Sequence, residues 1–337
     1  MTVLVRCDYL GDLRRLLSAR LVADGFAVDA GDDAEAVLLK YLNVQQRGIP
    51  PGARQVQWSR ELRTREPSLP PNLRAVIDTI EQASVRGENL NPYLSRRLVR
   101  AKDADFTDPL DNDWGMKHMH LGDAEESPGV IKGTRELLFV IVRADTLYLI
   151  EVGKHGDWVS QRLFDIAESN WPELFAHAAM NGISGDNLSE ETRRVLRKKF
   201  AMGTTVAGGK VYIAPGGGQA ASGLNFELRR VADQLLNRIH ALEEAHKSQG
   251  EEIAAKIERK TGRSLGELHL QLHDVAAGGE ITVVEVQTNI GLKSSMTIEC
   301  AQCPTAVQAT REAALSLGWT LVAALGWVCP NCGSVGD

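Results

Sequence analysis

The sequence lacks three features that would assign it to a membrane, to secretion or to general nucleic-acid binding. No apolar run approaches the ~20 residues that a membrane-spanning helix needs. Residues 1–8 show no charged leader, no long apolar stretch and no small-residue cleavage site. Basic residues are not in excess either: 38 Lys and Arg stand against 44 Asp and Glu, and the net charge of −6 argues against indiscriminate nucleic-acid binding. We therefore expect a cytoplasmic protein without a membrane partner.

What the chain has is an ordinary globular composition, with 43% hydrophobic and 24% charged residues over 337 positions. This length allows two domains, or one large domain with a small module. The apolar patterns predict an α+β protein with a central antiparallel hairpin. We expect a mainly helical region over residues 1–105, a histidine-bearing α+β core with a long helix over residues 106–292, and a zinc ribbon over residues 293–337.

The most informative stretch surrounds three of the eight histidines. Within it, apolar runs at residues 137–142 and 146–152 predict a β-hairpin, because only three residues separate them. His118 and His120 lie two residues apart, so they share one face if their segment is a strand. His155 follows the second apolar run in a turn, and a hairpin can bring such a turn back towards the preceding segment.

Histidine is the side chain whose ordinary pKa lies closest to working pH, so this cluster is a candidate for acid–base chemistry. In the preferred hypothesis His118 and His120 are the general base and general acid of metal-independent RNA cleavage, and His155 assists them. Cations would stabilise the charge that develops on the phosphorane. The candidate cations are Lys117 and Arg135 in the catalytic site and Lys154 in substrate binding. The alternative is that the histidines are structural.

Two other functions fit the same residues. The three histidines with an open fourth position could bind a metal ion, as in hydrolytic zinc sites. Asp113, Glu151 or Asp157 would then be a further ligand or the hydrogen-bond partner of a ligand. Alternatively, the chain is a nucleic-acid-binding or regulatory protein that uses its zinc ribbon and basic helices. In that case RNA or DNA would bind with a steep salt dependence and stay intact.

A strand-like segment at residues 210–214 leads into a glycine-rich loop that contains Gly216, Gly217 and Gly218. No Gly-Lys-Ser/Thr follows, so the loop is not a P-loop, and it lacks the full dinucleotide glycine spacing. It is either a tight turn into the next helix or a phosphate site, where backbone N–H groups and Ser222 would bind substrate at the start of that helix.

Two helical segments also leave two interpretations open. The basic segment at residues 193–199 is either a solvated helix face or a phosphate-contacting patch. The long helix expected over residues 225–260 has an apolar stripe between Leu228 and Leu242. That stripe packs either on its own domain or on a second copy of the chain, so a homo-oligomer through this helix is a candidate assembly.

Four of the five cysteines form two C-x-x-C pairs near the C-terminus, Cys300 with Cys303 and Cys329 with Cys332. Two such pairs roughly 25 residues apart match a four-thiolate structural zinc site. We expect one structural Zn²⁺ per chain and a helix over residues 307–317 between the pairs. Disulfides are the competing interpretation, which the missing secretion signal disfavours.

Four short motifs carry a resemblance to a known protein family: Asp113-Trp114-Gly115, His118-Met119-His120-Leu121-Gly122, Asn170-Trp171-Pro172 and Pro215-Gly216-Gly217-Gly218. Together they resemble a bacterial protein family without an assigned activity, over roughly residues 40 to 225. The histidines around a hairpin are also similar to compact endoribonuclease toxins of the barnase and RelE-like kind. The C-terminal segment resembles zinc ribbons of actinobacterial and phage-related proteins. These resemblances imply a toxin or phage-defence nuclease that acts on RNA and has a protein inhibitor as a candidate partner.

Overall fold

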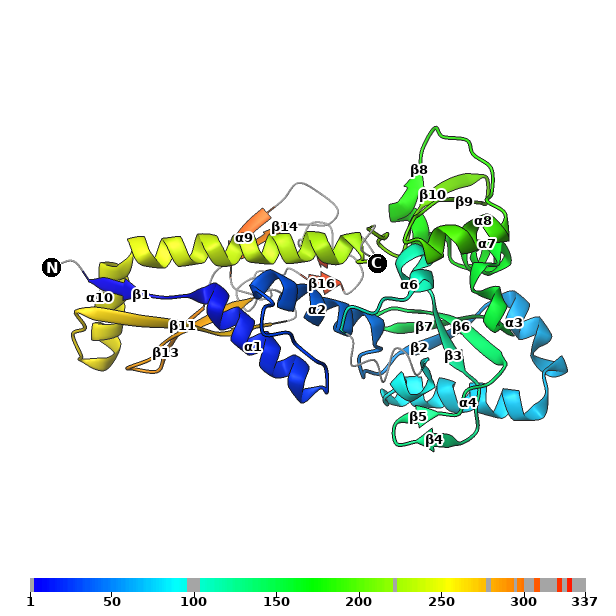
Figure 1. Cartoon of the computed structure of the whole chain (residues 1–337), viewed down its shortest axis with the longest axis horizontal. Helices are drawn as coiled ribbons and strands as arrows, with labels where there is room; N and C mark the ends of the chain where they lie inside the picture. Colours follow the sequence, from blue (N-terminus) through cyan, green and yellow to red (C-terminus); the bar gives the residue numbers. More distant parts are fainter. Residues whose placement is uncertain are drawn as a thin grey trace. The chain divides into compact units, whose positions relative to one another are not determined.

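The computed structural model describes residues 3–95, 104–220, 223–276 and 280–293, and the short segments 296–299, 306–309, 320–322 and 326–328. The protein is α+β, as the sequence predicts, and has two compact units (Figure 1). One unit is Lys40–Arg230, and the other joins Met1–Leu39 to Val231–Asp337. This division differs from the expected boundaries at residues 105 and 292, because the segment after residue 40 packs with the histidine-bearing core.

A four-stranded mixed sheet organises the unit Lys40–Arg230, in the order β2-β7-β6-β3. Its strands are β2 (Gln55–Trp58), β7 (Thr146–Lys154), β6 (Glu136–Val142) and β3 (Lys117–His120). β6 and β7 form the predicted antiparallel hairpin, β3 pairs antiparallel with β6, and β2 pairs parallel with β7. Because side chains alternate along a strand, His118 and His120 belong to one face of the sheet and Lys117 to the other.

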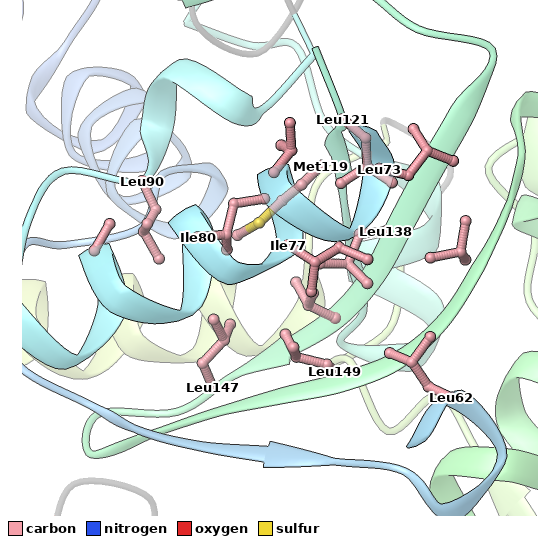
Figure 2. Close-up of a cluster of buried hydrophobic side chains, with 14 of the residues drawn as sticks. Leu62, Leu73, Ile77, Ile80, Leu90, Met119, Leu121, Leu138, Leu147 and Leu149 are labelled. Carbon is pink, nitrogen blue, oxygen red and sulfur yellow. The ribbon is translucent and has the colours of Figure 1, made fainter. Parts of the chain in front are cut away.

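One face of this sheet is covered by α4 (Pro71–Arg86), whose buried apolar residues recur at helical spacing. Leu73, Ile77 and Ile80 of α4 share a buried cluster with Met119, Leu138, Leu147 and Leu149 of the strands (Figure 2). Full burial of one such side chain stabilises the fold by about 1.5–3 kcal/mol. The helix ends at Gly87, whose φ of 75° is a left-handed conformation that glycine adopts without strain.

The opposite face is covered by α7 (Gln161–Asn170) and the 3-10 helix η4 (Pro172–Ala178). Phe139 and Ile141 of β6 share a second buried cluster with Phe164, Phe175 and Tyr212. Tyr212 lies in β10 (Lys210–Ile213), the middle strand of a small antiparallel sheet with β8 (Ala179–Met180) and β9 (Thr204–Ala207). His118 stands opposite Phe139 in the ladder between β3 and β6, so the histidine pair belongs to this second face.

Three short elements are α6 (Pro109–Trp114), η3 (His155–Val159) and α8 (Glu190–Lys198), and α8 contacts both α6 and η3. α6 leads directly into β3, and η3 follows β7 without a gap. The other described elements between residue 34 and β8 are α2 (Ala34–Arg47), α3 (Arg60–Arg65), η1 (Glu66–Ser68), η2 (Asn91–Tyr93), β4 (Glu125–Ser127) and β5 (Val130–Ile131).

The second unit has a sheet in the order β1-β11-β12-β13 and the helix α1 (Tyr9–Ala23). β1 (Leu4–Arg6) pairs parallel with β11 (Glu267–Val275), and β12 (Ile281–Glu285) and β13 (Ile290–Lys293) continue the sheet in antiparallel fashion. The predicted long helix is two helices, α9 (Phe226–Ser248) and α10 (Gly250–Thr261). In α9, Ala232 and Ile239 are buried, whereas Leu228, Leu235 and Leu242 are half-buried. A homo-oligomer through this stripe remains a prediction.

The described part of the C-terminal segment contains two antiparallel strand pairs. β14 (Met296–Glu299) pairs with β15 (Ala306–Ala309), and β16 (Thr320–Val322) pairs with β17 (Gly326–Val328). The helix expected from residue 307 onwards does not begin there, because pairing with β14 makes residues 306–309 a strand. The cysteines Cys300, Cys303, Cys329 and Cys332 lie outside the described residues. Within the described part of the chain, no helix combines the length and the hydropathy needed to span a membrane.

Candidate active site: a cluster of three histidines

The structure brings the three predicted histidines together. His118 and His120 come from β3, and His155 is the first residue of η3, directly after β7. The ring centres of His118 and His120 lie 6.3 Å apart, those of His118 and His155 lie 6.5 Å apart, and those of His120 and His155 lie 5.3 Å apart. The hairpin therefore returns the turn to the preceding strand, as its short loop suggests.

His155 is the most exposed residue of the cluster. The side chain of His118 is 17% exposed, His120 is buried, and His155 is exposed to solvent. The cluster thus has a buried end at β3 and an open end at η3.

His118 faces a carboxylate that the sequence hypothesis did not include. Its Nδ1 atom lies 3.8 Å from Oδ2 of Asp108, and this buried nitrogen makes no hydrogen bond. Asp108 is the N-cap of α6, since its Oδ1 accepts a hydrogen bond from the backbone N–H of Leu110 at 2.9 Å. Burial lowers the pKa of His118 below its ordinary value of 6.5, and the nearby Asp108 opposes that effect. His118 is therefore held neutral at neutral pH.

Asp108 could have been found from sequence, because Asp followed by Pro is a typical start of a helix. The pair Asp108-Pro109 is such a start, only ten residues before His118. What the sequence does not contain is the direction of the second carboxylate oxygen, which depends on how α6 turns into β3.

Thr134 fixes the orientation of His120. The backbone N–H of Thr134 donates to Nδ1 of His120 at 3.2 Å. The Thr134 hydroxyl accepts from the N–H of Leu121 at 2.9 Å and donates to the carbonyl of Glu136 at 2.6 Å, which joins the end of β3 to the start of β6. Because Nδ1 of His120 accepts, the proton of the neutral ring is assigned to Nε2.

The turn that bears His155 is closed by Asp157. Oδ2 of Asp157 accepts from the N–H of Lys154 at 2.8 Å. At the other end of η3, the carbonyl groups of Trp158 and Val159 accept hydrogen bonds from two arginines of α8. The position of His155 is therefore determined at both ends of its turn.

The predicted cations divide into two groups. Lys117 points to the other face, where its Nζ donates to the carbonyl of Gln46 at 2.9 Å and to the carboxylate of Asp111. The structure therefore does not bring Lys117 to the histidines, since adjacent residues of a strand face opposite sides. Arg135 and Lys154 are both exposed: Arg135 follows Thr134, whose backbone N–H contacts His120, and Lys154 directly precedes His155.

The carboxylates proposed for a metal site have other partners. Asp113 pairs with Arg197 at 2.8 Å, and Glu151 pairs with Arg65 at 2.9 Å and with Arg162 at 3.3 Å. Over the described residues, no group of three or more His, Cys, Asp or Glu side chains is arranged to hold a metal ion. The three rings are close, but their donor atoms do not converge on one point in this conformation.

The glycine loop holds α6 instead of leaving its amides open to a phosphate. Gly216 and Gly218 donate their N–H groups to the carbonyls of Asp113 and Asn112, at 3.0 and 2.9 Å, and Gly217 donates to the carbonyl of Ala214 at 2.9 Å. All three N–H groups of the proposed phosphate site are thus already hydrogen-bonded. Ser222 lies outside the described residues.

No protein-family model, no curated protein and no solved structure matches this chain.

Proposed function

We propose that the chain is a metal-independent endoribonuclease. The observation that supports this function is the approach of His118, His120 and His155 to within 6.5 Å of one another, with an open side at His155. General acid–base catalysis needs groups within a hydrogen-bond reach of about 3 Å from the atoms that exchange protons. Two imidazoles at this separation can contact the attacking and the leaving oxygen of one phosphodiester.

The geometry favours His118 as the general base. Burial keeps its ring neutral, and Asp108 stands next to Nδ1, so the proton belongs on Nδ1 and the lone pair on Nε2. A carboxylate that holds the opposite ring nitrogen of a base in one tautomer is a recurring arrangement in hydrolytic sites. This assignment replaces the simple pairing of His118 with His120 suggested by their spacing.

His155 is then the general acid, and His120 is a hydrogen-bond donor to the phosphate. An exposed ring such as His155 exchanges protons directly with water, which the regeneration of an acid requires. His120 presents N–H at Nε2 in its neutral form, because Nδ1 accepts from Thr134. Arg135 and Lys154 supply positive charge for the phosphorane.

The reaction balances without a further reactant. His118 takes the proton of the 2′-hydroxyl as the O2′–P bond forms and the P–O5′ bond breaks. His155 gives its proton to the leaving O5′ atom. The products are a 2′,3′-cyclic phosphate and a 5′-hydroxyl, and proton exchange with water restores both histidines.

The test is cleavage of a labelled RNA oligonucleotide in the presence of a chelator, with product ends identified by mass spectrometry. We expect cyclic-phosphate ends, and no cleavage where the 2′-hydroxyl is replaced by hydrogen. His118→Ala and His155→Ala should each lower the rate by about 10²–10⁴, the usual contribution of a general acid or base. His240→Ala changes an exposed histidine on α9 and is the control.

Other outcomes point elsewhere. Products with 5′-phosphate ends, formed only with added metal, would indicate a metal-dependent hydrolase. RNA that binds with a steep salt dependence and stays intact would indicate a binding protein. Either result overturns the proposed function.

A further inference from the structure

Two arginines of α8 are almost fully buried, which is unusual for a side chain that stays charged. Arg197 is 1% exposed and Arg193 is 2% exposed. Both guanidinium groups lie over the ring of Trp114, at 4.1 and 4.8 Å from its centre. These residues are therefore neither a solvated helix face nor a phosphate-contacting patch. Most of their polar partners lie in α6 and η3, the two segments next to the histidines.

Arg197 binds α6 and η3 at the same time. Its Nε and Nη2 atoms donate to Oδ2 of Asp113 at 3.0 and 2.8 Å, and its Nη1 atom donates to the carbonyl of Trp158. Asp113 lies near the end of α6, and the same short helix begins after its N-cap Asp108. Trp158 lies in η3, whose first residue is His155. One guanidinium group thus joins the segment that faces the base to the turn that bears the acid.

Neighbouring contacts make this connection stiff. Arg193 donates to the carbonyl of Val159 at 2.9 Å and to the side-chain oxygen of Gln161 at 2.6 Å, so it holds the end of η3. Gly216 packs so closely on α6 that an added Cβ would lie 2.0 Å from the carbonyl oxygen of Asp111. α6 is therefore held by the glycine loop as well as by Arg197.

We propose that Arg197 is a positioning residue, which sets the distance between His118 and His155 by joining Asp113 to the Trp158 carbonyl. This inference rests on the proposed function, in which those two histidines are base and acid. A displacement of about 1 Å between catalytic groups can cost roughly a hundredfold in rate. Loss of the connection should therefore appear in kcat more than in KM.

The experiment compares Arg197→Lys with Arg54→Lys. Lysine keeps the charge at position 197 but offers a single ammonium group, which cannot bind both Asp113 and the Trp158 carbonyl. Arg54 is also buried and donates to three backbone carbonyls, those of Pro50, Gly52 and Arg143, next to the loop at the opposite end of the hairpin. We expect both variants to melt at lower temperature, but only Arg197→Lys to lose roughly a hundredfold in kcat per folded molecule.

The second measurement is the imidazole NMR spectrum, which does not depend on activity. The imidazole chemical shifts of His118 and His155 should change in Arg197→Lys and stay unchanged in Arg54→Lys. Unchanged kcat, or unchanged imidazole signals, in Arg197→Lys would overturn the inference. If the wild-type chain does not cleave RNA, the proposed function fails and the imidazole signals alone decide the positioning role. Asp113→Asn, with the same expectations, is the substitute if Arg197→Lys does not fold.

Discussion

Nδ1 of His118 lies 3.8 Å from Oδ2 of Asp108, while the other oxygen of the same carboxylate caps α6. One side chain thus connects the start of a helix to a buried imidazole. The distance is longer than a hydrogen bond, but catalytic hydrogen bonds are often long without substrate and shorten in the complex. The relationship therefore makes a prediction about how the base titrates.

We expect Asp108→Asn to move the acidic limb of the cleavage pH profile further below pH 6.5. Burial lowers the pKa of His118 from its ordinary 6.5, and the charge of Asp108 opposes this shift. Without that charge the pKa falls further, so the base stays neutral down to a lower pH. The plateau rate should fall by at most about a hundredfold, because the ring loses an orienting partner but keeps its lone pair. The measurement is kcat/KM from about pH 5 to about pH 8.

Asparagine is also a good N-cap, so the melting temperature of Asp108→Asn should stay close to that of the wild type. Asp123→Asn removes a charge from an exposed position and is the control. An acidic limb that stays in place, or moves to higher pH, contradicts the role of Asp108.

Lys117 should matter for stability and not for cleavage. Burial raises the pKa of Asp111, and the charge of Lys117 opposes that rise. Lys117→Met leaves this buried carboxyl group unpaired, which should cost about 3–5 kcal/mol of unfolding free energy in urea denaturation. Asp111→Leu combined with Lys117→Met should recover much of that loss, because no unpaired buried charge remains.

The cleavage rate per folded molecule should be unchanged in Lys117→Met, because Lys117 faces away from the histidines. A large loss of rate with normal stability would return Lys117 to the catalytic site.

The parts of the fold predicted correctly are those with a strong local pattern. The apolar runs at residues 137–142 and 146–152 permit little except paired strands, and the two-residue spacing places His118 and His120 on one face. The parallel partners were not predictable in this way. β2 is a four-residue strand in a segment rich in proline, and β1 pairs with β11 across most of the chain.

The structure brings together the three histidines that the sequence singles out, but the residues that hold them in place were not predicted. A charged residue can be predicted to be buried only when its ion-pair partner is known. The partner of Arg197 is Asp113, which lies 84 residues away in the sequence. The basic run that contains Arg197 therefore suggests a surface, while the fold buries every fourth residue of it. The contribution of Thr134 is a backbone N–H group, which every residue except proline has, so no sequence pattern distinguishes it.

Gly216→Ala should destabilise the unit that contains the histidines. The added Cβ would lie 2.0 Å from the carbonyl oxygen of Asp111 and 2.4 Å from the backbone nitrogen of Gly115, so the backbone must move. Overpacking of this kind typically costs about 1–3 kcal/mol. Thermal unfolding followed by circular dichroism measures the loss. Gly52→Ala is the control, because an added Cβ there meets no atom within 4 Å. Equal melting temperatures in the two variants would show that the packing of the glycine loop on α6 does not contribute to stability.

The C-terminal strands lead to a prediction about metal content. β14 ends at Glu299 and β17 ends at Val328, so each strand directly precedes one C-x-x-C pair in the sequence, and the two strands are in contact. Each pair can present two thiolates, which suits one tetrahedral zinc ion. We expect plasma mass spectrometry to find about one zinc per chain. Cys300→Ser combined with Cys329→Ser should remove it, while His118→Ala combined with His120→Ala should leave it in place. Two metals per chain, with one lost in the histidine variant, would instead place a metal at the histidines and contradict metal-independent cleavage.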